Sequence, residues 1–284
     1  MKKKKVNQFK KIYRITIKFL LFSIISFISP FLKKLGFNLI PDLSKVNFFN
    51  FNYSINTRRL VFNTKNKKKF NKIFIDTSLS NTKLCELGKK FPTNKSPIQL
   101  IGHRSGYTGI YNLLFSPLID KTINLAEIGI EDNNSIKMWR SYFKKAVIHG
   151  FEFDDKKIKK AKKHKLNKTY IHKINVNDKK NIIESFKKIK TKFDIIIDDS
   201  THIFEDQIRV IKNCYKILNK NGILIIEDIY KYGNKYSEEN YFINLKKIKK
   251  YFNNIVFIDC NHVNNFQANW KNDKILLMVR NNKN

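Results

Sequence analysis

The sequence predicts an α/β fold, in which a doubly wound, mainly parallel sheet of seven strands carries helices on both faces. From Asn124 onward, short apolar segments alternate with amphipathic ones, the pattern of strands joined by crossover helices. Two further apolar segments end the chain, and we expect the last strand to be antiparallel. This arrangement is Rossmann-like, and we expect an N-terminal helical extension in front of it.

Each predicted strand is a short apolar run bounded by polar or turn residues. The runs are INLAEI (123–128), AVIHGF (146–151), YIHKI (170–174), DIIID (194–198), GILIIE (222–227), IVFIDC (255–260) and KILLMVR (274–280). The clearest helix is predicted over residues 203–219, where apolar side chains recur at intervals of four and three residues. Asn221-Gly222 supplies its stop signal.

Three regions follow from these patterns: a basic and apolar N-terminal helical extension (1–41), an irregular connection (42–83) with at most one short strand, and the α/β domain (84–284). The apolar run Phe19–Leu32 is shorter than the ~20 residues that a spanning helix needs. Its lysine flanks favour a helix at the membrane surface, through residues 1–34. A helix packed on its own domain, or one that pairs subunits in a homo-oligomer, stays open.

The formal net charge is +34, which would suit a nucleic acid or an anionic membrane as partner. Only seven of the 57 basic residues are arginine, the residue that best reads phosphates and base edges. Lysine, asparagine and isoleucine are enriched everywhere, which favours an AT-rich coding bias and disfavours nucleic acid as partner. The three widely spaced cysteines are typical of a reduced, cytoplasmic protein, which the extension could hold at the inner face of the membrane.

Polar residues stand at the ends of the first three predicted strands, where such sheets bind ligands. Gly129 allows a tight turn after the first strand, but the G-x-G-x-x-G pattern of nicotinamide dehydrogenases is absent. Glu152 ends the second strand, where a carboxylate can accept hydrogen bonds from two ribose hydroxyls. Asn175 or Asp178 follows the third and could meet an adenine edge. Together they predict an adenosine ligand without a pyrophosphate.

The fourth and fifth strands end in carboxylates. In the expected strand order they are neighbours, so Asp199, Glu227 and Asp228 would lie together and bind a divalent cation such as Mg²⁺. The cation would grip substrate oxygens and lower the pKa of a hydroxyl, which makes Asp199 a catalytic residue as well as a ligand. His202 is placed to take the proton as general base, although it could instead cap the following helix. Asp198 is either structural or close to the cofactor.

Several motifs between Leu84 and Arg280 point to one family. They are Thr93-Asn94-Lys95, His103 with Gly106-Tyr107-Thr108 and Tyr111, Glu127-Ile128-Gly129, the run Ser135 to Arg140, Glu152, Asp198-Asp199-Ser200-Thr201-His202, and Glu227-Asp228. Together they resemble the class I S-adenosylmethionine-dependent sugar O-methyltransferases of the macrocin and mycinamicin type. The family's glycine-rich turn is reduced here to Gly129, followed by Glu131, Asp132 and Asn133.

The resemblance implies an O-methyltransferase with S-adenosylmethionine and Mg²⁺ or another divalent cation as cofactors, and a small-molecule or glycan acceptor. It implies a set of residues at the cofactor: Glu127, Gly129, Ser135, Glu152, Asn175, Asp198 and Tyr107. It assigns the metal to Asp199, Glu227 and Asp228 and the base to His202, as the strand ends do. The alternative is a catalytically weak or inactive protein of this fold that binds RNA or anionic membrane, which the reduced glycine turn and the high charge favour.

Overall fold

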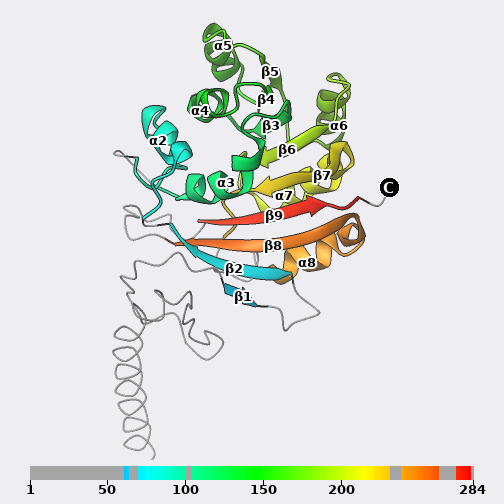
Figure 1. Cartoon of the computed structure of the whole chain (residues 1–284). Helices are drawn as coiled ribbons and strands as arrows, with labels where there is room; N and C mark the ends of the chain where they lie inside the picture. Colours follow the sequence, from blue (N-terminus) through cyan, green and yellow to red (C-terminus); the bar gives the residue numbers. More distant parts are fainter. Residues whose placement is uncertain are drawn as a thin grey trace, which may run out of the picture. The chain divides into compact units, whose positions relative to one another are not determined.

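The computed structural model describes residues 61–63, 70–77, 79–99, 104–230, 238–261 and 273–282 (Figure 1). Their strands form a single nine-stranded sheet in the order β1-β2-β8-β9-β7-β6-β3-β4-β5. β6 pairs in parallel with both β3 and β7, and β9 runs antiparallel to its neighbours β7 and β8. The predicted fold class is confirmed, including the antiparallel last strand.

All seven predicted strands are present, with ends that shift by a few residues. They are β3 (Asn124–Ile128), β4 (Val147–Glu152), β5 (Thr169–Lys173), β6 (Phe193–Asp198), β7 (Leu218–Ile226), β8 (Phe252–Asn261) and β9 (Lys274–Arg280). The central strands are buried on both faces, as their continuous apolar runs require. Because β3, β4, β5, β6 and β7 pair in parallel, their carboxyl ends meet at one edge of the sheet.

Helices cover both faces of this sheet, as the alternating pattern predicts (Figure 1). The core on one face includes side chains of four helices: α2 (Lys83–Lys90), α3 (Tyr107–Phe115), α4 (Asn134–Tyr142) and α5 (Asp155–Lys163). The core on the other face includes side chains of α6 (Lys179–Lys187), α7 (Phe204–Cys214) and α8 (Glu238–Leu245).

Two strands occur where an irregular connection is predicted. β1 (Val61–Asn63) pairs antiparallel with β2 (Asn71–Asp76), and β2 pairs in parallel with β8. Lys72 of β2 forms ion pairs with Asp259 of β8 (2.8 Å) and Glu238 of α8 (2.7 Å). The sheet therefore gains two strands beyond the predicted seven, because backbone pairing with β8 and these ion pairs offset the weak hydrophobicity of the segment.

The helix predicted over residues 203–219 is shorter in the structure. α7 ends at Cys214, and a short 3-10 turn (Tyr215–Ile217) leads into β7. Leu218 fits the helical spacing but lies opposite Phe193 as the first residue of a strand, where both side chains are buried. The helical spacing of apolar residues continues past the end of α7 into the first residue of β7. The predicted end of the helix was therefore several residues too far along the chain.

The predicted membrane-surface helix in residues 1–34 lies outside the described residues, and so does His103. The described helices include none with the length and apolar character that crossing a membrane requires. Peripheral membrane contact and homo-oligomer formation stay predictions.

Candidate active site

A cavity of about 640 Å³ opens at the carboxyl ends of β3, β4, β5, β6 and β7. Four of the predicted cofactor residues line it, namely Gly129, Ser135, Glu152 and Asn175. Asp199, His202 and Asp228 line the same cavity, so the two groups of strand-end residues share one space. The cavity is within the usual size range for small-molecule sites.

Gly129 joins the two sides of this cavity. Its φ of +84° lies in the left-handed region, which favours glycine. A Cβ at this position would lie 2.1 Å from the carbonyl oxygen of Asp199 and 2.8 Å from the Cα of Ser200. The sequence predicts a tight turn here, and the structure adds a second reason for glycine: the loop after β6 passes directly against it.

Two further residues of the turn adopt left-handed conformations without being glycine. They are Glu131, with φ of 42°, and Asn133, with φ of 67°. Asn133 tolerates this conformation and is buried, and its backbone N–H donates to the carbonyl of Ile130 (2.6 Å). Glu131 is exposed and pays the usual steric cost of a Cβ in this region. The turn therefore keeps a glycine-like path with only one glycine.

Glu152 holds the turn in place from the end of β4. Its Oε2 accepts hydrogen bonds from the backbone N–H groups of Ile130 (3.3 Å) and Glu131 (3.1 Å). Its Oε1 accepts from Phe153 (2.8 Å) and Asp154 (3.1 Å). Four amide donors surround one buried carboxylate, so the charge of Glu152 is compensated entirely by backbone.

The run Ser135 to Arg140, the most specific part of the resemblance, has a clear structural role. Trp139 lies in the core under β3, and its indole N–H donates to Glu127 Oε2 (3.1 Å). Arg140 donates to the backbone carbonyls of Ala146 (2.6 Å) and Phe143. These contacts fasten α4 to the sheet, and the indole holds Glu127, which is buried and does not line the cavity.

On the other side of the site, three carboxylates from neighbouring strands surround one lysine. Lys95, in the loop after α2, is 1% exposed. Its Nζ lies 2.5 Å from Glu227 Oε2 and 3.6 Å from Glu127 Oε1, and it forms a further ion pair with Asp199 Oδ2. The carboxylates stand at the ends of β3, β6 and β7, which are adjacent in the sheet.

The electrostatics of this cluster follow from burial and crowding. Burial alone would lower the pKa of Lys95, but Asp199, Glu227 and Glu127 outweigh it and hold that pKa well above its usual value. Burial raises the pKa of Glu127 to about 7, against the opposing effect of Lys95. Burial and the nearby Asp199 raise the pKa of Glu227 as well. One ammonium thus does not compensate all of the carboxylates around it.

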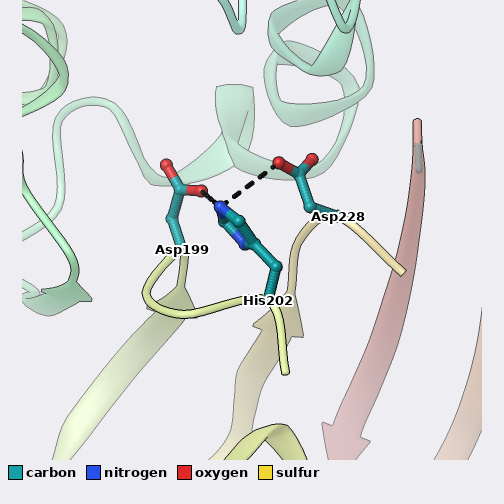
Figure 2. Close-up of side chains that lie close together, drawn as sticks. All are labelled: Asp199, His202 and Asp228. Carbon is teal, nitrogen blue, oxygen red and sulfur yellow. Dashed lines mark ion pairs between the residues drawn. The ribbon is translucent and has the colours of Figure 1, made fainter. Parts of the chain in front are cut away.

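Asp199, His202 and Asp228 form a second group at the rim of this cluster (Figure 2). His202 Nε2 lies 3.6 Å from Asp228 Oδ2 and 3.9 Å from Asp199 Oδ1. One potential ligand atom from each residue lies within 4.8 Å of the others. In Figure 2 the imidazole ring points between the two carboxylates. Asp199 belongs to both groups, since its Oδ2 pairs with Lys95 while its Oδ1 faces His202.

Two members of this second group have strained backbones. His202 has φ of 58° and Asp228 has φ of 55°. A non-glycine residue in the left-handed region costs roughly 1–3 kcal/mol, and such strain is often found where function fixes a side chain. Both residues lie in the loops after strands, His202 after β6 and Asp228 after β7, where a left-handed step can direct the side chain into the site.

Two tyrosines of α3 hold the carboxylates of β7 from behind. Tyr107 donates its hydroxyl hydrogen to Asp228 Oδ1 (2.7 Å), and Tyr111 donates to Glu227 Oε1 (2.6 Å). Both rings are buried in the core. Tyr107 thus meets the site through Asp228 and is not among the residues that line the cavity. Asp198 is buried as well; it accepts from the Ser200 hydroxyl (2.6 Å), and burial raises its pKa to about 7.

The structure brings Asp199, His202 and Asp228 together, as the strand ends predict, but the partners of Glu227 were not predicted. Glu227 lies at the site as predicted, yet its carboxylate pairs with Lys95 and Tyr111, and the described residues whose atoms could jointly hold an ion are Asp199, His202 and Asp228. The sequence identifies Lys95 only as the last residue of the motif Thr93-Asn94-Lys95 and predicts no function for it. Its burial and its partners depend on folding of distant segments, which no local pattern reveals.

A family model described as a methyltransferase domain matches residues 123–282, more than half of the chain. The chain therefore belongs to this methyltransferase-domain family. The matched region contains β3 to β9, and thus nearly all of the strand-end residues described above. The sequence-based prediction of a methyltransferase is confirmed at this level.

Two curated relatives come from Streptomyces olivaceus. One is the 8-demethyl-8-alpha-L-rhamnosyl tetracenomycin-C 2'-O-methyltransferase, 25% identical over 130 residues that cover 43% of this chain and 33% of the relative. The other is the 8-demethyl-8-(2-methoxy-alpha-L-rhamnosyl)-tetracenomycin-C 3'-O-methyltransferase, 27% identical over 132 residues that cover 44% of this chain and 32% of the relative. The chain thus spans about a third of the length of these relatives.

Among solved structures, the chain is similar to the MycE methyltransferase from the mycinamycin biosynthetic pathway, in complex with Mg and SAH. The TM-score is 0.53 at 17% sequence identity, over 71% of this chain and 55% of MycE. At this identity the similarity supports the fold. MycE was also solved with Mg, SAH and mycinamycin VI, again with a TM-score of 0.53.

Proposed function

We propose that this protein is an S-adenosylmethionine-dependent O-methyltransferase that uses a divalent cation and methylates a sugar hydroxyl of a glycan or secondary metabolite. The observation that carries the proposal is the grouping of Asp199, His202 and Asp228 at the rim of a cavity that Gly129 and Glu152 also line. The names of both curated relatives describe methylation of a rhamnosyl group or its derivative, which supports a sugar as acceptor. A cytoplasmic location is part of this proposal, since the methyl donor is supplied there.

The cavity fits S-adenosylmethionine in size and in the chemistry of its walls. We assign the adenosine end to the β3–β4 side of the cavity, where Gly129, Glu152 and Asn175 lie. Phe153 follows Glu152, is largely exposed and lines the cavity, so an apolar face is available to an adenine ring. Glu127 and Asp198 lie beneath this floor and are assigned to its support. The ribose hydroxyls would share Glu152 with the amides that already bind it.

The carboxylate cluster also fits a divalent cation. Four carboxylates lie at the ends of β3, β6 and β7, and Lys95 offsets one negative charge. We assign Asp199 and Asp228 as the metal ligands, because their free oxygens face each other across His202. Glu227, which the sequence predicts as a third ligand, is not assigned to the metal, because its carboxylate pairs with Lys95. A cation bound there would hold acceptor oxygens and lower the pKa of the hydroxyl to be methylated.

His202 acts as the general base in this proposal. Its Nε2 lies between two carboxylates, which would stabilise the imidazolium that forms when the ring takes the hydroxyl proton. Tyr107 donates a 2.7 Å hydrogen bond to the other oxygen of Asp228. Tyr107 thus holds Asp228, and Asp228 in turn holds the imidazole of His202 in position. The remaining acceleration comes from holding the hydroxyl in line with the donated methyl group.

The alternative of an inactive, RNA- or membrane-binding protein of this fold is not favoured. Such a protein would gain nothing from the buried Glu127 and Glu227 and the partly buried Asp199 held around one lysine, since burying charge is costly. The strain at His202 and Asp228 is a further cost that catalysis would account for.

Isothermal titration with S-adenosylmethionine, with and without Mg²⁺, tests the first part of the proposal. We expect binding in both cases, and no binding of NAD. A methyl-transfer assay on rhamnosylated acceptors, with Mg²⁺ or with EDTA, tests the second part. Activity that EDTA leaves unchanged would contradict the role of the cation, and absence of S-adenosylmethionine binding would contradict the proposal as a whole.

A further inference from the structure

The ammonium group of Lys95 occupies the kind of position that a metal ion would take, surrounded by carboxylate oxygens. This buried ammonium lies among carboxylates of three adjacent strands. The ammonium is in direct contact with Asp199 and Glu227, and it lies 3.6 Å from Glu127 Oε1. Oxygen atoms converging from separate strands on a single positive centre are what a hard cation requires.

Glu127 supports this interpretation independently. Its Oε1 is fully buried and accepts no hydrogen bond from the described residues, although Oε2 accepts from Trp139. A buried carboxylate oxygen without a hydrogen bond is costly unless a positive charge is near. The nearest positive charge is the Lys95 ammonium. The oxygen therefore depends on whatever cation occupies that position.

Asp199 connects this position to the one proposed for the divalent ion. Its Oδ2 is bound to Lys95, and its Oδ1 faces His202 and the Asp228 side. A carboxylate that presents one oxygen to each of two cations is the usual bridge of two-metal sites, whose ions lie about 3.5–4 Å apart. Here one of the two cations is supplied by the chain itself.

We propose that Lys95 occupies a second cation position, bounded by Glu127, Asp199 and Glu227, and thereby limits the site to a single divalent ion. Lys95 is a positioning residue in this scheme: it keeps Glu227 away from the catalytic ion and directs Asp199 Oδ1 toward it. The inference rests on the metal-binding part of the proposed function, but it makes a separate claim about how many ions the site can hold.

The test counts Mn²⁺ bound per chain by equilibrium dialysis in the wild type and in Lys95→Ala. Lys95→Ala removes the ammonium and opens space for an ion with its water, so we expect it to bind one more Mn²⁺ than the wild type. Lys157→Ala is the matched control, because Lys157 lines the same cavity but has no ion pair with these carboxylates. We expect this control to bind the same number of ions as the wild type.

Thermal melting with increasing Mn²⁺ gives a second measure. Without its ammonium the carboxylate cluster should destabilise the fold, and Mn²⁺ should restore the melting temperature of Lys95→Ala by a larger shift than it gives the wild type. A variant that binds the same number of ions as the wild type, or that stays unfolded at every Mn²⁺ concentration, would overturn the inference. A wild type that binds no Mn²⁺ would instead contradict the proposed metal dependence.

Discussion

The two sides of the cavity stabilise their carboxylates by different kinds of groups. On the β3–β4 side, Glu152 is surrounded by four backbone N–H groups, which are fixed parts of the fold. On the β6–β7 side, Asp199, Glu227 and Asp228 crowd together and depend on side chains, chiefly Lys95 and two tyrosines. The first side is complete without a ligand, whereas the second keeps an excess of negative charge.

In the proposed function, this difference separates the side that holds the cofactor from the side where the chemistry takes place. A carboxylate satisfied by backbone is rigid and suits a contact that holds a ligand in place. Carboxylates with raised pKa values, such as Glu227 and Asp228, suit a site where charge must change or where a cation enters. Burial is the main cause of both shifts, with the neighbouring Asp199 adding to it.

Among the substitutions considered, replacing Gly129, which lies between the two sides, should have the largest effect on stability and ligand binding. Gly129→Ala would place a Cβ 2.1 Å from the Asp199 carbonyl oxygen and force a left-handed alanine. We expect a loss of about 3 kcal/mol or more in the free energy of unfolding, together with loss of both ligands. Urea denaturation and isothermal titration would measure these effects.

Gly150→Ala is the matched control for this change. A Cβ there would meet the flexible end of the Ile171 side chain at 3.0 Å, and the φ of Gly150 is not in the left-handed region. Its cost should be clearly smaller. If the two variants were equally stable, the close approach of the two loops at Gly129 would not be what requires glycine.

His202→Asn should break only the β6–β7 side. Asparagine tolerates the left-handed φ of 58°, so the loop is expected to keep its path while the proposed base is lost. Methyl transfer should fall by roughly 10²–10⁴-fold, the usual contribution of a general base. Binding of Mn²⁺ and S-adenosylmethionine should change little, which titration of each would measure. A large loss of Mn²⁺ affinity would make His202 a ligand and not the base.

Glu152→Gln should impair only the ligand binding of the β3–β4 side. The new amide group would turn a donor toward two backbone N–H groups, and the charge that balances four donors would disappear. We expect S-adenosylmethionine to bind about 100-fold more weakly, equivalent to ~3 kcal/mol. The number of Mn²⁺ ions bound should match the wild type. Equal losses of both ligands would mean that the two sides are not independent.

The sequence predicted the positions of the site residues better than their partners. Asp199 and His202 follow a buried strand, so the strand pattern alone placed them at the correct edge. The direction of the Glu227 side chain depends on Lys95, which lies 132 residues away in the chain. No periodicity links such distant residues, and the pairing arises only when the loop after α2 packs against the carboxyl ends of the strands.

The same limit explains why the connection, predicted to contain at most one short strand, contains two. Asn71–Asp76 has too few apolar residues to be read as a buried strand, and it forms one because β8 offers a free edge. Lys72 then pairs with Asp259 and Glu238, an arrangement that its local sequence does not indicate. Local patterns thus predicted the central strands, while the edge of the sheet depended on long-range partners.

Glu131→Gly should have the smallest effect, and it should strengthen the β3–β4 side. Glu131 is exposed and has φ of 42°, so its Cβ is a steric cost with no visible compensation from burial. Glycine would remove that cost, partly offset by its greater freedom in the unfolded chain, for a net gain of no more than about 1 kcal/mol. Glu131→Ala keeps the Cβ while removing the charge, so it separates the two causes. We expect urea denaturation to give higher stability for the glycine variant alone, with S-adenosylmethionine bound at least as tightly as by the wild type. If the alanine variant gained as much, the charge of Glu131 and not its backbone conformation would be the cause.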